Sequence, residues 1–179
     1  SRIDGPERIS EDGVVSLNVN EGIVSDIELR FLGSDGEANV DGKPIKGKTK
    51  DWVIKRELKT VPGSVFNRKI LEADIKRLYA TSLFDDIRVS LGPDKKNPGE
   101  VIIILDFSEQ KTGSLTGGIG YSNGSGVFAQ IGLKESNTLG RAWSSAINLN
   151  FGEYSTTYNI SLSDPWIKGD KHKTAFRTN

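Results

Sequence analysis

Residues 67–91 read NRKILEADIKRLYATSLFDDIRVSL, and they change from a helical pattern to a strand pattern. Asn67 is a favourable N-cap, because its side-chain oxygen can accept hydrogen bonds from the first free N–H groups of a helix. Four residues recur at helical spacing and would lie on one side of this helix: Leu71, Ile75, Leu78 and Ser82. After Asp85 the period becomes two, and the residues expected to face the core are Ile87, Val89 and Leu91. The stretch therefore predicts a helix to about Thr81 and then a strand.

Three further elements flank this stretch. Residues 23–32 alternate between apolar and charged side chains and predict a strand. Residues 50–58 predict a short helix that ends before Pro62, and residues 100–107 predict another strand. The order is strand, helix, helix, strand, strand, with one apolar face per element. It predicts an α+β domain over residues 23–111, with two helices on a three-stranded sheet.

The predicted strand at residues 85–91 becomes an edge of this sheet if the last strand, residues 100–107, lies in the middle. An edge strand carries free backbone N–H and C=O groups, which can pair with another extended chain. The outward charges of Asp86 and Arg88 would discourage indiscriminate pairing without removing those groups. The candidate binding residues on this edge are Asp86, Ile87, Arg88, Val89 and Ser90.

From Thr112 onward the chain contains only strand patterns and becomes poorer in charge and richer in Gly, Ser, Thr and Asn. Apolar and small polar residues alternate in four segments, at residues 113–122, 127–134, 143–151 and 155–162. Strands with one apolar and one polar face are expected in a transmembrane β-barrel, which has lipid on its outside and a water-filled interior. Residues 112–179 therefore predict four or five antiparallel strands of an incomplete transmembrane β-barrel. A water-soluble sandwich is the alternative that periodicity leaves open.

Three glycines interrupt the first of these strands, at Gly117, Gly118 and Gly120. Glycine has no side chain to pack and weakens strand pairing, so these residues are candidates for a loosely held lateral-gate strand. The other interpretation is that they relieve crowding where the sheet curves. The sequence favours neither interpretation.

Composition excludes several classes of protein. The 179 residues include 24 basic and 24 acidic side chains, one His and no Cys. The balanced charge argues against a nucleic-acid partner, and the lack of cysteine excludes disulfides and thiolate metal sites. The longest apolar run, Val101 to Leu105, is far shorter than the roughly 20 residues of a transmembrane helix. His172 lies in a charged run. We therefore expect no enzyme, metal site or cofactor.

One motif suggests a different function. Residues 42–49 read GKPIKGKT and satisfy the P-loop pattern, and residues 102–106 resemble a magnesium-binding partner strand. A true P-loop follows a buried strand directly, whereas Ser34 to Asp41 separates the first predicted strand from Gly42. Nucleotide binding is therefore a minor alternative.

Several segments, taken in order, resemble the BamA-like outer-membrane assembly factors and their cyanobacterial and chloroplast outer-envelope relatives. Residues 72–79 (EADIKRLY) and 83–89 (LFDDIRV) resemble the second helix and following strand of a POTRA (polypeptide-transport-associated) domain. Residues 118–122 (GIGYS), 137–141 (NTLGR) and 164–166 (DPW) resemble the opening of the family's barrel. The long loop at residues 33–49 resembles that of the cyanobacterial and plastid branch.

The resemblance implies a domain order. Residues 1–22 would be the remnant of a preceding POTRA domain, whose last strand is predicted at residues 14–20. Residues 23–111 would be the POTRA domain adjacent to the barrel, and residues 112–179 the first barrel strands. The family's late Arg-Gly-Phe element has no counterpart, so the chain is expected to be a fragment.

The resemblance also implies a function. Such a protein binds unfolded β-barrel precursors by β-augmentation and inserts them into an outer membrane or plastid outer envelope, with the POTRA domain on the periplasmic or equivalent side. Its expected partners are these precursors, neighbouring POTRA domains, the rest of the barrel and the lipid bilayer. The alternative is a protein-translocating pore, of the envelope-import or two-partner-secretion type.

Overall fold

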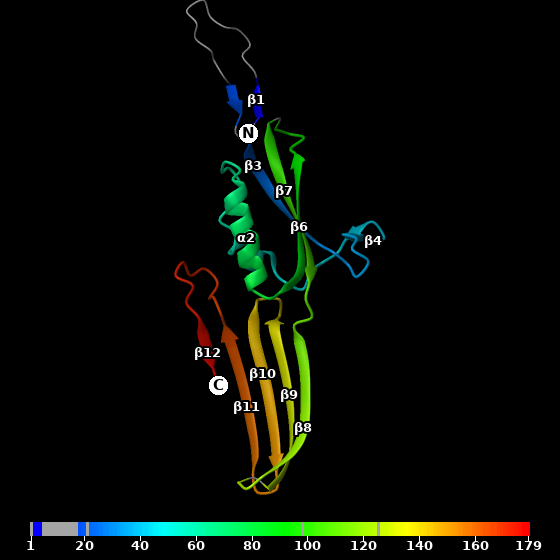
Figure 1. The fold of residues 1–179 in the computed structure, drawn as a ribbon, viewed down its shortest axis with the longest axis vertical. Helices are drawn as coiled ribbons and strands as arrows, with labels where there is room; N and C mark the ends of the chain where they lie inside the picture. Colours follow the sequence, from blue (N-terminus) through cyan, green and yellow to red (C-terminus); the bar gives the residue numbers. More distant parts are fainter. Residues whose placement is uncertain (1, 5–17, 21, 98, 125) are drawn as a thin grey trace, which may run out of the picture. The chain divides into compact units, whose positions relative to one another are not determined.

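The computed structural model describes residues 2–4, 18–20, 22–97, 99–124 and 126–179. These residues divide into two compact units (Figure 1). The first unit contains the N-terminal part to Ile45 together with Arg56–Ala80 and Asp86–Ser108, and the second contains Lys46–Lys55, Thr81–Asp85 and Glu109–Asn179. The predicted domains, residues 23–111 and 112–179, are continuous segments, whereas each of these units combines several segments of the chain. The domain limits therefore stay a prediction.

The sheet of the first unit has three strands, in the order β3 (Ile23–Phe31), β7 (Glu100–Glu109) and β6 (Phe84–Pro93). The last strand in sequence lies in the middle, as the edge prediction required. The β3 and β7 strands pair in parallel from Ile23↔Glu100 to Phe31↔Phe107, a direction that the alternation of their residues does not indicate. A hairpin joins β6 to β7, and the Asp94 N–H donates to the Glu100 carbonyl at 3.2 Å.

Two helices occupy the predicted positions. The first, α1, is shorter than expected and spans Asp51–Lys55, whereas α2 spans Arg68–Ala80. Asn67 caps α2 as predicted, because its Oδ1 accepts hydrogen bonds from the N–H groups of Lys69 and Ile70 at 3.0 and 3.3 Å. The α2 helix lies beside the three-stranded sheet and buries Leu71 and Leu78 (Figure 1).

The core of the first unit follows the predicted apolar faces, with one exception. Ile103, Leu105 and Phe107 of the central strand are fully buried, and the Phe107 ring lies 5.9 Å from that of Phe31. Its other buried apolar residues are Val24, Ile27, Phe31, Leu71, Leu78 and Ile87. Val89 and Leu91 were expected to face the core, but their side chains are 41% and 51% exposed. The core therefore ends at Ile87, and the outer half of β6 projects beyond it.

The second unit carries one antiparallel sheet in the order β12-β11-β10-β9-β8. Its strands are β8 (Gly113–Ser122), β9 (Gly126–Thr138), β10 (Trp143–Gly152), β11 (Thr156–Asp164) and β12 (Phe176–Thr178). All four predicted segments are strands, and β12 is the fifth. The sheet is open, with β8 and β12 at its two edges in the part of the chain that the structure describes (Figure 1).

The strand register gives this sheet two different faces. One face carries a row in which Leu115 pairs with Leu133 and Leu133 pairs with Ile147. The opposite face carries a row in which Thr116 pairs with Gly132 and Gly132 pairs with Asn148. Residues that pair directly across strands share a face, so the predicted apolar and polar faces are confirmed.

Four short strands complete the described structure. The strands β4 (Asn39–Val40) and β5 (Lys43–Pro44) form a small hairpin inside the predicted loop at residues 33–49. The strands β1 (Arg2–Asp4) and β2 (Asn18–Asn20) pair antiparallel. The rest of the predicted strand at residues 14–20 lies outside the described residues. Among the residues described, no helix has the length and apolar character to cross a bilayer.

Candidate functional site

The first candidate site is the edge formed by β6. The β7 strand pairs with one side of β6, and no other described strand pairs with its opposite side. Asp86, Ile87, Arg88, Val89 and Ser90 all lie on this edge, as predicted. Arg88, Val89 and Ser90 are exposed residues on this unpaired edge, where another extended chain could pair with the backbone.

A side chain of α2 covers the beginning of this edge. The Ile87 N–H donates to the Tyr79 hydroxyl at 3.0 Å, and that hydroxyl donates to Asp86 Oδ1 at 3.3 Å. Arg88 Nε donates to Asp86 Oδ2 at 3.0 Å, and this bond, followed by that from Tyr79, lowers the pKa of the Asp86 carboxyl. The Ile87 N–H therefore points away from β7, and by strand alternation the Val89 and Leu91 N–H groups point the same way.

The second candidate site is the β8 edge, which carries Gly117, Gly118 and Gly120. A Cβ atom at Gly120 would lie 2.6 Å from the Phe128 ring, and one at Gly118 would lie 3.4 Å from Gln130 Nε2. At Gly117 the nearest atom would be the Gln130 carbonyl oxygen, at 3.9 Å. Crowding therefore explains Gly120 and contributes at Gly118, whereas Gly117 has room for a side chain.

We expect Gly117→Val to strengthen the pairing of β8 with β9. Valine fits the open space and favours extended backbone, and strand propensities differ by about 1 kcal/mol. The β8 amides should therefore exchange with deuterium about fivefold more slowly in the intact protein. Gly124→Ala, in the β8–β9 turn with open space around it, is the control and should leave exchange unchanged. Unchanged exchange in Gly117→Val would remove the gate interpretation.

The P-loop-like segment is occupied by contacts with the protein itself. Lys48 Nζ lies 2.8 Å from Glu135 Oε2, and the Thr49 hydroxyl accepts a hydrogen bond from Asn137 Nδ2 at 2.8 Å. Glu109 accepts the N–H groups of Lys48 and Thr49 at 2.7 and 2.6 Å. In the other unit, Asp106 forms an ion pair with Arg30 at 2.6 Å. The residues that would bind a nucleotide phosphate and its magnesium ion therefore form hydrogen bonds and ion pairs with other residues of the protein.

The same segment contacts the turn between β9 and β10. Lys50 N–H donates to the Gly140 carbonyl at 2.9 Å, and Asn137 Oδ1 accepts the Ala142 N–H at 2.9 Å. Gly140 has φ +71°, and a Cβ there would overlap the Lys48 carbonyl oxygen. The sequence NTLGR at residues 137–141 is thus explained by close packing. We define residues 48–50 and 137–142 as the turn clamp.

A buried carboxylate in the first unit escaped the sequence analysis. Asp74 is fully buried in α2 and accepts the Lys59 and Thr60 N–H groups at 3.0 and 2.8 Å. Arg77 Nη2 also donates to Asp74 Oδ1. The available signal was the position of Asp74, which lies between Leu71 and Leu78 on the apolar face of the helix.

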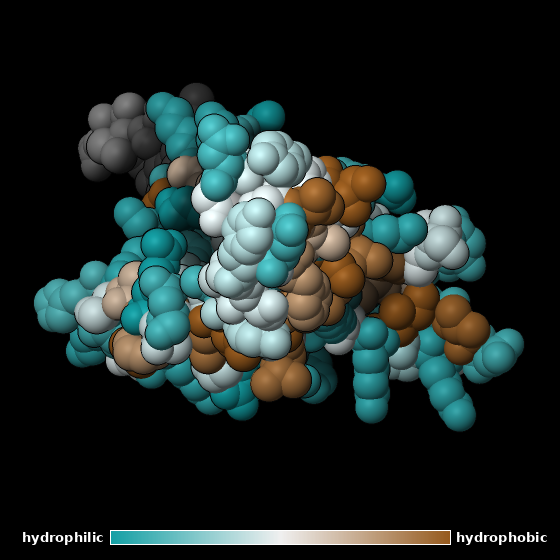
Figure 2. Space-filling model, turned by 90° about the horizontal axis from the view of Figure 1, so that it is seen from below, coloured by the Kyte–Doolittle hydropathy of each residue, from teal (hydrophilic) through white to brown (hydrophobic). Residues whose placement is uncertain are grey.

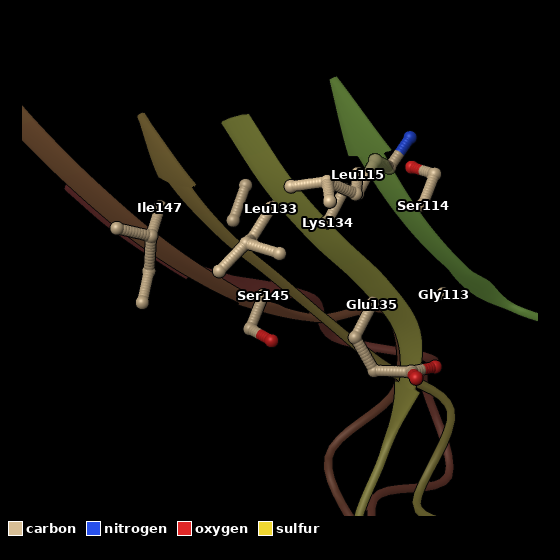
Figure 3. Close-up of a pocket in the computed structure, with 9 residues that line it drawn as sticks. Gly113, Ser114, Leu115, Leu133, Lys134, Glu135, Ser145 and Ile147 are labelled. Atoms are coloured by element: carbon tan, nitrogen blue, oxygen red, sulfur yellow. The ribbon is translucent and has the colours of Figure 1, made fainter. Parts of the chain in front are cut away.

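The apolar face of the five-stranded sheet is exposed. Ile119 is 88% exposed, and other large side chains of this face that lie open are Leu115, Tyr121, Val127, Ile131, Leu133, Ile147, Phe151, Tyr158 and Ile160. Figure 2 looks at the hairpin ends of the sheet and shows hydrophobic side chains gathered at the surface. Leu115, Leu133 and Ile147 from three strands line a shallow hollow on this face (Figure 3).

Tryptophan and cationic side chains form pairs in this second unit. The Arg141 guanidinium lies 4.9 Å from the Trp143 ring centre, and Lys173 Nζ lies 4.4 Å from that of Trp166. Lys168 Nζ lies 5.4 Å from the Trp52 ring centre. Trp143 begins β10, and Trp166 follows β11. Amphipathic aromatic and cationic residues at strand ends are typical of a membrane interface.

Among the described residues, no group of three or more His, Asp or Glu side chains has an arrangement that could hold a metal ion. The geometry thus offers the two candidate edges, β6 and β8, and an exposed apolar face, which are features of interaction with other chains and with lipid.

Comparison with known proteins agrees with these features. Residues 36–110 match the POTRA family, described as a surface antigen variable number repeat. The chain is also 30% identical over 169 residues to chloroplastic outer envelope protein 80 of Arabidopsis thaliana, covering 91% of this chain and 22% of that protein. The chain contains a POTRA domain, and its predicted resemblance to the BamA-like outer-membrane proteins is confirmed. It spans about a fifth of the length of this relative.

Solved BamA-like structures share the fold. The BamA structure from Haemophilus ducreyi lacking POTRA domains 1–3 has 27% sequence identity and a TM-score of 0.61, and covers 93% of this chain and 30% of that one. POTRA domains 1–3 of Omp85 from Anabaena have 40% identity and a TM-score of 0.55, and cover 62% of this chain and 43% of that one. The predicted fold class, a POTRA fold followed by antiparallel strands of the barrel type, is confirmed.

Proposed function

We propose that this BamA-like protein assembles β-barrel precursors in an outer membrane or plastid outer envelope. In this proposal the β6 edge binds an unfolded precursor as an added strand, and the precursor then passes to the barrel strands at β8. The observation that carries it is the outer edge of β6, with which no other described strand pairs and along which Val89, Ser90 and Leu91 are exposed. The activity is an interaction between chains and uses no catalytic residue, cofactor or nucleic acid.

The five-stranded sheet supports the membrane half of this proposal. Its exposed apolar face has the character of a surface that meets lipid, and its opposite face carries the polar row that contains Thr116 and Asn148. The three tryptophan–cation pairs add an interface element.

The alternative function is translocation of a precursor through the barrel. The chain is 29% identical over 97 residues to chloroplastic protein TOC75 of Pisum sativum, which keeps this alternative open. A reconstitution of the intact protein in liposomes separates the two functions. Insertion leaves a folded β-barrel precursor in the bilayer, whereas translocation leaves it inside the vesicle and protected from external protease.

We expect Val89→Pro to weaken precursor binding about tenfold. Proline removes the outward N–H of Val89, and its ring occupies the position of the added strand. Loss of one hydrogen bond and this steric conflict together cost about 1.4 kcal/mol. The measurement is fluorescence anisotropy of a labelled peptide with the sequence of residues 143–152, a typical barrel strand, titrated with the intact protein in detergent.

Two controls accompany this measurement. Val89→Thr keeps the N–H and should bind the peptide within about twofold of the unchanged protein. A peptide N-methylated at alternate residues cannot form the hydrogen bonds of an added strand, and it should bind weakly to both the unchanged protein and the Val89→Thr variant. Equal affinity of the Val89→Pro and Val89→Thr variants would exclude edge capture at β6.

A further inference from the structure

Tyr79 occupies a backbone group that an added strand would use. A strand that pairs with the free side of β6 needs the outward N–H groups of Ile87, Val89 and Leu91. The first of these already donates to the Tyr79 hydroxyl at 3.0 Å. Val89 and Leu91 are exposed, and the bonds described above occupy neither of their N–H groups.

The Tyr79 hydroxyl is held in this position from two sides. It accepts the Ile87 N–H and donates its own proton to Asp86 Oδ1 at 3.3 Å, so both of its hydrogen-bonding functions are engaged. Arg88 Nε in turn holds the other Asp86 oxygen at 3.0 Å. The Asp86 carboxyl therefore stays ionised and remains a good acceptor for the phenol.

We propose that Tyr79 is a register stop, which limits strand addition on β6 to the segment from Val89 onward. This inference rests on the proposed capture of precursors by β6 and adds a specificity-determining residue to it. The hydroxyl removes one pairing position, and the ring, anchored on α2, stands beside Ile87 where the added strand would otherwise continue. Asp86 and Arg88 are positioning residues that hold the stop in place.

A register stop has a functional consequence. Pairing that begins at one fixed residue aligns every precursor strand on the edge in the same way, since a shift of one residue would turn each side chain to the other face. A short paired segment also keeps the affinity low, so that a bound strand can be released. The stop further protects the sheet against continuous edge-to-edge aggregation.

Tyr79→Phe tests the hydroxyl, and Tyr79→Ala tests the ring. Tyr79 is 41% exposed and lies in the last turn of α2, so alanine there keeps the helix. In the absence of any peptide, Tyr79→Phe should raise the deuterium exchange rate of the Ile87 amide about tenfold in the intact protein, because that amide loses its hydrogen bond to the Tyr79 hydroxyl. Lys76→Ala, an exposed position on the same helix, is the control and should leave this rate unchanged.

Peptide binding provides the second measurement. With the labelled peptide of residues 143–152, Tyr79→Ala should bind about threefold to tenfold more tightly than the unchanged protein, because one further hydrogen bond becomes available. The gain should disappear for a peptide shortened by two residues at each end, which has no residues left to use the added position. Lys76→Ala should bind both peptides as the unchanged protein does.

The outcomes separate this inference from the proposed function. If Val89→Pro weakens binding but both Tyr79 variants bind like the unchanged protein, precursor capture stands and the register stop is wrong. Faster deuterium exchange of the Ile87 amide without any gain in peptide affinity would also exclude the register stop. Tyr79 would then only satisfy the Ile87 N–H within the folded protein. If the unchanged protein does not bind the peptide, the proposed function and the register stop both fail.

Discussion

Replacing Asp74 by alanine should destabilise the POTRA-type unit by about 3–5 kcal/mol, the range seen when one partner of a buried ion pair is removed. The carboxylate is fully buried and accepts two backbone N–H groups, from Lys59 and Thr60. Alanine leaves both donors without their acceptor and leaves Arg77 without its charge partner. The expected result is loss of most deuterium-exchange protection in residues 56–80 of the intact protein.

Two further variants show which property of Asp74 matters. Asp74→Asn keeps one acceptor oxygen but loses the charge, so its effect should lie between those of the unchanged protein and Asp74→Ala. Glu72→Ala is the matched control on the same helix. Its side chain is 56% exposed and pairs with Arg68, and exposed pairs contribute about 0–1 kcal/mol. Equal effects of Glu72→Ala and Asp74→Ala would show that Asp74 does not hold the residues 59–60 in place.

The sequence predicted the elements of the first unit because each of them carries a strong local pattern. Helical spacing around Leu71 and Leu78, and alternation in β3 and β7, need no knowledge of neighbours. Two features depend on neighbours, and local patterns do not reveal them. Period-two alternation is the same in parallel and antiparallel strands, so it does not indicate the parallel pairing of β3 with β7. The alternation also continues through Val89 and Leu91, so these exposed residues were wrongly expected to face the core.

The candidate sites divide in a similar way. The sequence predicted a strand at residues 86–90, and its position at an edge followed only on the condition that the last strand is central, which the strand order meets. The glycines of β8 are visible in the composition alone. The Tyr79 contact could not be predicted, since it joins the last turn of α2 to a backbone N–H eight residues later across a turn. The turn clamp joins residues 48–50 to a turn almost 90 residues away, and its spacing in sequence carries no period.

The turn clamp allows a second prediction, at Gly140. Gly140→Ala should destabilise the second unit by about 3 kcal/mol, through two separate effects. Alanine at φ +71° costs about 1–2 kcal/mol, and its Cβ would overlap the Lys48 carbonyl oxygen. Residues 48–50 must then move away, and the bond from the Lys50 N–H to the Gly140 carbonyl is lost. Deuterium exchange in residues 46–55 and 137–142 of the intact protein should rise together.

Gly169→Ala separates the close approach in the clamp from backbone strain alone. Gly169 has φ +87° in the loop after β11, and nothing lies within 4 Å of a Cβ built there. It should therefore show only the conformational cost, about 1–2 kcal/mol, with normal exchange in residues 46–55. If Gly140→Ala and Gly169→Ala lost the same amount of stability, the close packing of Gly140 against Lys48 would contribute nothing to the stability of the second unit. A larger loss of stability in Gly140→Ala than in Gly169→Ala would mean that the turn at residues 137–141 needs glycine to hold residues 48–50. Only a residue without a side chain leaves room there for the Lys48 carbonyl.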